Sequence, residues 1–192
     1  MNETEISVEL SSLGANALHF FWNTTGALTQ IELQPSAISK DRKIPAQEGL
    51  PLGVPLYLIE LKVALQRYFE TGEPLAEPRW EFLDQTAWTE FQKKVYRAIA
   101  SIPPGETRTY GWVAQRIGSV GATRAVGQAL RRNPIPILIP CHRVVARKSL
   151  GGFMGISDPN LPELKLKNAL LSLEEKYLNP SFTFLMFSGA VV

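Results

Sequence analysis

Cys141 is the only cysteine of the chain, and it is followed directly by His142, one of two histidines, and by Arg143. A thiol is a nucleophile only as the thiolate, and a neighbouring imidazole or guanidinium lowers its pKa from about 8.5. A lone cysteine is more often a small buried apolar residue without chemistry. The two basic neighbours favour a nucleophilic thiol here. The imidazole would then need a further group, usually a carboxylate, to fix its tautomer.

The residues before the cysteine predict how it is positioned. Residues 135–139 are a short apolar run between prolines, which is typical of a buried strand. Pro140 has no N–H for a strand ladder, so we expect it to end the strand and to place Cys141 on a turn. Because adjacent side chains of an extended segment point in opposite directions, we expect a bridging water to carry the proton between Cys141 and His142.

The motif around the cysteine, Pro140-Cys-His-Arg-Val144, resembles the signature of the methylated-DNA–protein-cysteine methyltransferases, also called O-6-alkylguanine-DNA alkyltransferases. The resemblance extends upstream through Arg124-Ala-Val-Gly127 and Asn133-Pro134, and downstream to Lys167-Asn-Ala-Leu-Leu-Ser-Leu-Glu174. It covers roughly residues 86–175. Several motifs in the family's order are far more specific than one short pattern.

This resemblance implies a single-turnover alkyl transfer without a cofactor. The Cys141 thiolate would take the alkyl group from the O-6 position of a guanine that is flipped out of duplex DNA. By the resemblance, His142 relays the proton through a water, Glu174 orients His142, and Asn133 holds the turn and the active-site strand in register. From the residues alone, Asn133 also fits ordinary turn chemistry before a proline, and Glu174 also fits a charge on a helix surface.

The resemblance also implies which residues bind the base and the DNA. Tyr110 would crowd the 3′ phosphate and help to rotate the nucleotide, and Arg124 would take the nucleotide's place in the base stack. Pro136 would form part of the pocket wall. Backbone groups near the cysteine and near Val144 and Met154 would bind the base.

The net charge of +2 is the sum of a basic segment and an acidic remainder of the chain. Residues 86–155 contain eleven Lys and Arg but only two acidic residues, whereas the remainder is net acidic. Such a basic segment favours a polyanionic partner, a nucleic acid, because neutralised phosphates release counterions, and the resemblance implies that this partner is double-stranded DNA. Surface Lys and Arg that only solvate a small domain are the alternative.

Three short helices followed by a strand are predicted in the basic segment, an order typical of a winged or helix-turn-helix DNA-binding unit. The first begins after Thr86 or Thr89, the second spans about residues 110–117, and the third spans about residues 121–132. In the family the third helix enters the minor groove. Helical spacing places these residues on one of its faces, which could also be an ordinary solvated face: Arg124, Gln128 and Arg131 or Arg132.

The first half of the chain predicts a small supporting domain. Alternating or apolar stretches at residues 6–10, 17–22 and 27–33 indicate a three-stranded antiparallel sheet. Residues 57–69 carry apolar side chains at helical spacing. We therefore expect an α/β (α+β) fold. Its parts would be an N-terminal α/β domain with a linker at residues 1–84, a C-terminal winged-helix-like DNA-binding and catalytic domain at residues 85–178, and an apolar tail at residues 179–192.

Composition limits the compartment and the metal chemistry. A single cysteine excludes an intramolecular disulfide and indicates a reducing compartment, so we expect a cytoplasmic protein, or a nuclear one in a eukaryote. One Cys and two His are a poor set for a zinc site, and His19 is predicted to be a packed core residue, so no metal is expected. No stretch approaches the about 20 apolar residues of a membrane helix. We expect a monomer without a membrane partner.

The chain departs from the family pattern beside the pocket. The family usually has a Tyr in a G-Y-x-G-G run, whereas this chain has Gly151-Gly-Phe-Met-Gly155, one residue nearer the cysteine. Phe153 can stack on a base but offers no hydroxyl to the leaving guanine. Residues 156–163 are inserted and predict a surface loop that bears on the substrate range. The apolar tail is expected to pack on the N-terminal domain.

Two other functions are compatible with the sequence. A non-catalytic alkyltransferase-like protein would flip the damaged base without repairing it, but proteins of that kind lack the cysteine that this chain has. A transcription factor would use the helix-turn-helix unit to read sequence, but minor-groove contacts read sequence poorly. Alkyl transfer is therefore the leading interpretation.

Overall fold

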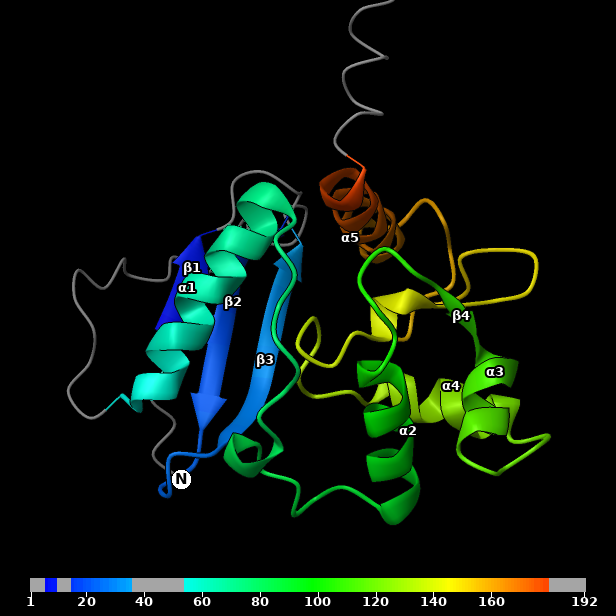
Figure 1. Ribbon diagram of the computed structural model, residues 1–192, viewed down its shortest axis with the longest axis horizontal. Helices are drawn as coiled ribbons and strands as arrows, with labels where there is room; N and C mark the ends of the chain where they lie inside the picture. The colour runs from blue at the N-terminus through cyan, green and yellow to red at the C-terminus, as the bar shows by residue number, and fades with distance from the viewer. Residues whose placement is uncertain (1–5, 10–14, 36–53, 180–192) are drawn as a thin grey trace, which may run out of the picture.

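The computed structural model describes residues 6–9, 15–35 and 54–179, whose elements form two groups that lie side by side (Figure 1). The first group consists of strands β1 (Ile6–Glu9), β2 (Ala15–Trp22) and β3 (Leu28–Pro35) and helix α1 (Leu56–Thr71). The second consists of α2 (Glu90–Ala100), β4 (Arg108–Thr109), α3 (Tyr110–Arg116), α4 (Thr123–Arg131), β5 (Val144–Val145) and α5 (Pro162–Leu178). The expected mixed α/β fold is confirmed.

The first group is an antiparallel sheet with the strand order β1-β2-β3, covered on one face by α1 (Figure 1). Phe20 pairs with Ile31 in the β2–β3 ladder, and both are buried. They share the core with Leu58 and Leu65, so the helical periodicity predicted for α1 matches the face that it buries. His19 is buried in β2, as the sequence predicts.

The predicted linker is tied to the sheet. Its 3₁₀ turn, Trp80–Phe82, is followed by Leu83, which bridges to Leu28 of β3, and the Asp84 N–H donates to the Leu28 carbonyl over 2.8 Å. The Ile31 N–H of β3 also donates to the Pro134 carbonyl of the second group over 2.8 Å. Buried apolar side chains form one continuous core through both groups.

The helices predicted in the basic segment are confirmed. Thr89 begins α2 with a capping box, since its hydroxyl accepts from the Gln92 N–H and the Gln92 side chain accepts from the Thr89 N–H. Thr109 caps α3 in the simpler way, by accepting from the Trp112 N–H. These caps satisfy N–H groups that the first turn of a helix leaves free, so the polar residue that starts each helix can be recognised in the sequence.

The strand predicted at residues 135–139 does not form. Ile137 has a φ of +71° in a turn, and only a single bridge joins Pro136 to Ile139. Prolines 134, 136 and 140 remove the N–H groups that a ladder needs, so the apolar run is buried as a turn instead. Cys141 begins a 3₁₀ turn, Cys141–Arg143, that leads into β5, and β5 pairs in parallel with β4.

The surface loop predicted at residues 156–163 is shorter than expected. Pro162 and Glu163 already lie in the first turn of the C-terminal helix α5, where proline is tolerated. The tail expected to pack on the first group lies outside the described residues, apart from Asn179. No helix in the described ranges combines the length and the apolar character needed to cross a bilayer.

Candidate active site

Cys141 lies at the end of a turn that Asn133 holds together. The Asn133 side chain accepts from the Ile135 N–H over 3.1 Å and donates to the Ile139 carbonyl over 2.8 Å. The Cys141 N–H donates to the same Ile139 carbonyl over 2.8 Å. The thiol is 7% exposed, so this scaffold presents a nearly buried sulfur in a defined position.

The pKa of the Cys141 thiol is raised, not lowered. Burial is the largest cause, and it is opposed in part by a hydrogen bond from Asn133, the charge of Lys167, and backbone N–H groups of the 3₁₀ turn. The expectation that the side chains of His142 and Arg143 lower this pKa is wrong. They are directed at Glu174 instead, because the 3₁₀ turn replaces the extended backbone that the sequence suggested.

Glu174 of α5 is the centre of the site and is fully buried. Its Oε1 accepts from the Tyr68 hydroxyl at 2.8 Å, His142 Nε2 at 2.9 Å and Arg143 Nη2 at 2.9 Å. Its Oε2 accepts from Arg143 Nε at 3.1 Å and from the Gly105 N–H at 2.9 Å. Burial raises the pKa of this carboxyl. The hydrogen bonds from His142 and Arg143, together with the charge of Arg143 and that of His142 once it is protonated at acid pH, outweigh burial and hold the pKa well below its usual range. The group is therefore a carboxylate at neutral pH.

This carboxylate fixes the tautomer of His142. A carboxylate can only accept, so the imidazole proton lies on Nε2, which faces Glu174 Oε1. Burial, as the largest cause, lowers the pKa of His142 despite the neighbouring carboxylate, so the ring is neutral at pH 7. Nδ1 then carries a lone pair, and it is buried without a hydrogen bond to any part of the chain that the structure describes. This is the arrangement of a general base.

A pocket of about 270 Å³ opens beside the thiol. Its walls come from α3, α4 and the segment after β5, and the Tyr110 hydroxyl donates to the Gly152 carbonyl over 3.3 Å across one side of it. Phe153 is 4% exposed, and this residue, which departs from the family pattern, lines the same pocket as Cys141. The predicted site residues that line it are Tyr110, Gln128, Arg131, Cys141, Phe153 and Met154.

A second hollow, of about 320 Å³, reaches Cys141 from the side of the sheet. It shares Arg131 and Met154 with the first, and it is closed by Asn133, Pro136 and residues of β3. Pro136 and Cys141 therefore line the same hollow, and the N-terminal sheet contributes to the surroundings of the thiol.

The remaining predicted residues do not line the first pocket. Arg124 and Arg132 are exposed on or directly after α4, with Gln128 and Arg131. Val144 is fully buried, and its backbone carbonyl accepts from Lys167 Nζ over 2.6 Å. The α4 side chains thus form a basic surface around the pocket mouth.

Sequence reasoning missed several residues of the site. Tyr68 comes from α1, far from the motif, and no local pattern marks it. Lys167 is fully buried, and its Nζ donates to the carbonyls of Leu150 at 2.6 Å and Gly152 at 3.1 Å as well as to Val144. Burial lowers the pKa of Lys167 to about 8. In the sequence, only its position as the first residue of the downstream motif, residues 167–174, marked Lys167 as a site residue. Within the described ranges no three Cys, His, Asp or Glu side chains converge as a metal site requires.

The family model that matches the chain is "6-O-methylguanine DNA methyltransferase, DNA binding domain", over residues 90–176. The chain is 47% identical over 96 residues to a methylated-DNA–protein-cysteine methyltransferase of Mycolicibacterium paratuberculosis, covering 50% of this chain and 54% of that protein. It is 42% identical over 124 residues to the constitutive enzyme of that name from Bacillus subtilis, covering 61% and 66%. The chain thus spans about half the length of the first of these relatives.

Solved structures match over more of the chain. Mycobacterium tuberculosis OGT in complex with DNA superposes with a TM-score of 0.63 at 30% identity, covering 90% of this chain and 92% of that one. The M. tuberculosis O6-methylguanine methyltransferase gives a TM-score of 0.66 at 28% identity, covering 95% and 99%. The similarity in structure therefore includes the N-terminal group of elements.

Proposed function

This chain belongs to the methylated-DNA–protein-cysteine methyltransferase family, and we propose that it repairs DNA by taking a methyl or other alkyl group from the O-6 position of guanine onto Cys141. The observation that supports this most strongly is the position of the thiol. Cys141 lies at the inner wall of a pocket whose mouth is bordered by the exposed basic face of α4. A base flipped from a duplex that contacts α4 would meet the sulfur.

The chemistry follows from the protonation states at the site. The thiol gives its proton to His142 Nδ1, through a water, while Glu174 holds the Nε2 proton in place. The sulfur attacks the alkyl carbon, the carbon–oxygen bond breaks, and its electron pair leaves with the base, which takes up a proton as guanine. The thioether that remains is not a nucleophile, so each chain acts once.

The burial of the thiol is consistent with this order of events. Burial keeps Cys141 largely protonated in the free protein, and the basic partner His142 is buried beside it. The thiolate would form mainly when the substrate is in place, which limits side reactions of the sulfur with other alkylating agents. Lys167 would favour the thiolate as a nearby positive charge.

We propose that α3 and α4 are the helix-turn-helix of a winged-helix-like unit, with α4 in the minor groove. Arg124 would take the place of the extruded nucleotide, and Tyr110 would press on the neighbouring phosphate. Gln128, Arg131 and Arg132 would contact the backbone. In this proposal residues 85–178 carry DNA binding and chemistry, residues 1–84 support them, and the protein acts as a monomer in the cytoplasm or nucleus.

Incubation with duplex DNA that carries O-6-methylguanine with a labelled methyl group tests the proposal. We expect the label to become covalently attached to the protein, and the DNA to be released with unmodified guanine. DNA that is bound while the protein stays unlabelled would show a non-catalytic damage sensor instead. No binding and no label would contradict both interpretations.

A further inference from the structure

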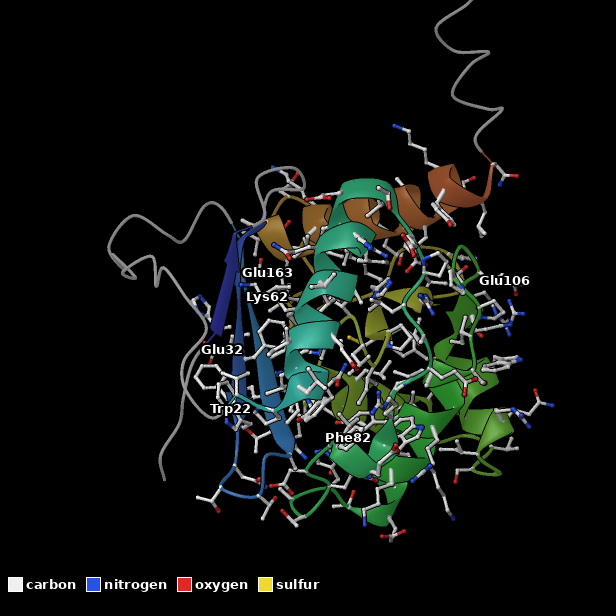
Figure 2. All side chains as sticks on the ribbon, turned by 60° about the vertical axis from the view of Figure 1, so that its left-hand side comes forward. Trp22, Glu32, Lys62, Phe82, Glu106 and Glu163 are labelled. Atoms are coloured by element: carbon white, nitrogen blue, oxygen red, sulfur yellow. The ribbon has the colours of Figure 1, made fainter. Side chains whose placement is uncertain are left out.

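Tyr68 joins the N-terminal group of elements to the residues that move the proton. It lies in the last turns of α1 and is fully buried, and its hydroxyl donates to Glu174 Oε1. The helices α1 and α5 contact each other, and Figures 1 and 2 both show α5 running past the C-terminal end of α1. No residue of the cysteine motif supplies this contact.

The approach of the two helices is close and depends on Gly72. This residue ends α1 with a φ of +81°, and its N–H donates to the Tyr68 carbonyl over 2.8 Å. A Cβ at Gly72 would lie 2.6 Å from the Leu173 carbonyl oxygen, the residue before Glu174. Backbone thus meets backbone one turn from Tyr68, which places the tyrosine hydroxyl against the carboxylate with little freedom.

We propose that Tyr68 is a positioning residue for alkyl transfer, which sets the geometry and the charge of the Glu174–His142 pair from the N-terminal half of the protein. Its hydroxyl donates to Glu174 Oε1 at 2.8 Å, the same oxygen that His142 Nε2 meets, and it is 3.5 Å from Nε2 itself. The hydrogen bond from Tyr68 withdraws negative charge from Glu174 Oε1, the oxygen that accepts the His142 Nε2 proton. It also fixes the imidazole so that Nδ1 faces away from the carboxylate.

This arrangement determines the basicity of His142. The charged or titratable groups that face the imidazole are Glu174 and Lys167 from α5, Arg143 and Cys141 from the 3₁₀ turn, and Tyr68 from α1. Without the Tyr68 hydroxyl, Glu174 Oε1 would interact more strongly with the Nε2 proton and stabilise the imidazolium. The ring would then stay protonated to higher pH and could not accept the thiol proton.

This proposal rests on the proposed alkyl transfer. The test therefore also uses a second reaction of Cys141, alkylation by a small reagent, which does not depend on DNA repair. The rate at which iodoacetamide alkylates Cys141 is measured against pH in the full chain, together with single-turnover transfer from methylated duplex DNA. For Tyr68→Phe we expect the acid limb of both profiles to move up by about one pH unit, so that both rates fall about tenfold on that limb and less at neutral pH.

Tyr57→Phe is the matched control. Tyr57 lies on the same helix, and its hydroxyl donates to the Gly26 carbonyl over 2.8 Å, far from the carboxylate. Its ring stacks on Phe82, which Figure 2 shows at the opposite end of α1 from α5. This variant loses the partly buried contacts of its hydroxyl with the Gly26 and Phe82 carbonyls, so we expect some loss of stability but unchanged pH profiles.

A second substitution at Tyr68 keeps the fold in place. Replacement by 3,5-difluorotyrosine retains the hydroxyl and makes it a stronger donor, so the acid limb should move to lower pH. The proposal is overturned if the profiles of Tyr68→Phe keep their shape and only stability falls, or, where that variant does not fold, if the fluorinated residue leaves the limb in place. Failure of the wild type to take a methyl group from DNA would overturn the proposed function but leave the iodoacetamide result intact.

Discussion

The buried centre at Glu174 and the exposed face of α4 differ in how their charged groups are surrounded. At the centre, one carboxylate accepts from donors on α1, the loop before β4, and the 3₁₀ turn, and the charged groups are almost entirely removed from solvent. On α4, Arg124, Gln128 and Arg131 project from a single helix into solvent. Buried charges are stable only with their partners, whereas exposed ones need none.

Because of this difference, substitutions in the two regions should have different effects on folding, chemistry and DNA contact. A substitution at the centre affects folding and chemistry together, because the side chains that donate to Glu174, those of Tyr68, His142 and Arg143, are all buried. A substitution on the exposed face of α4 should leave the fold intact and change only the contact with DNA.

Cys141→Ser should abolish alkyl transfer and leave DNA binding nearly unchanged. The hydroxyl is a much weaker nucleophile than the thiol, and the basic face of α4 does not include the sulfur. Binding of a methylated duplex by fluorescence anisotropy, beside the transfer assay, measures both effects. A loss of affinity as large as that of an α4 variant would show that the two regions are not separable.

Glu174→Gln should slow transfer by about 100-fold and lower the free energy of unfolding by about 3 kcal/mol. The amide leaves the buried Arg143 guanidinium without its counter-charge and no longer favours the His142 tautomer that accepts at Nδ1. Urea unfolding and single-turnover kinetics measure the two losses. Glu106→Gln is the control, because Glu106 pairs with Arg108 at the exposed edge seen in Figure 2, and it should change stability by less than about 1 kcal/mol.

The same carboxylate predicts the acid dependence of stability. Folding lowers the pKa of Glu174 below its unfolded value of about 4.3. Its contribution is therefore complete above that value and is lost as the pH falls below it toward the folded pKa. Between pH 6 and pH 3 the wild type should lose stability more steeply than Glu174→Gln, as measured by urea midpoints. Parallel curves would contradict the low pKa of this group.

Arg124→Ala should slow repair of duplex DNA by roughly 30-fold. The flipped nucleotide leaves a gap in the base stack, which costs a few kcal/mol when no side chain fills it. The reaction with free O-6-methylguanine base should be nearly unchanged, as should stability. Arg79→Ala removes the same charge from the linker beside α1 and is the control. Equal losses on duplex and free base would mean that Arg124 acts on the site and not on base flipping.

Phe153→Tyr should give the smallest effect, a gain of up to about tenfold in the single-turnover rate on methylated duplex. Phe153 lines the pocket beside Cys141 but has no hydroxyl for the leaving base. A tyrosine would add a donor to the charge that develops as the alkyl bond breaks. Equal rates for the wild type and the variant would show that another group already supplies this hydrogen bond.

Local signals in the sequence predicted a large part of this molecule. The capping residue Thr89 and the apolar periodicity of α1 and α4 were recognisable because a helix end and a buried face depend on residues close together in the chain. The candidate thiol was recognisable because the single cysteine of the chain is followed directly by a histidine and an arginine. Likewise, the exposed face of α4 needed only helical spacing.

The errors arose where distant residues decide the structure. The apolar run at residues 135–139 was taken for a strand, but Asn133 and the prolines hold it as a turn. The effect of Arg143 on the thiol was misjudged, since its partner Glu174 lies 31 residues away. Tyr68 is 106 residues from Glu174, and no periodicity relates positions so far apart.

The central claim is that Cys141 of each chain accepts one alkyl group and is then inactive. The most direct test is the intact mass of the full chain after incubation with an excess of duplex DNA containing O-6-methylguanine, followed by peptide mapping. We predict a gain equal to one methyl group per chain, carried by Cys141, with no further repair after the protein is consumed. Repair of several guanines per chain, or a methyl group on any other residue, would contradict the account.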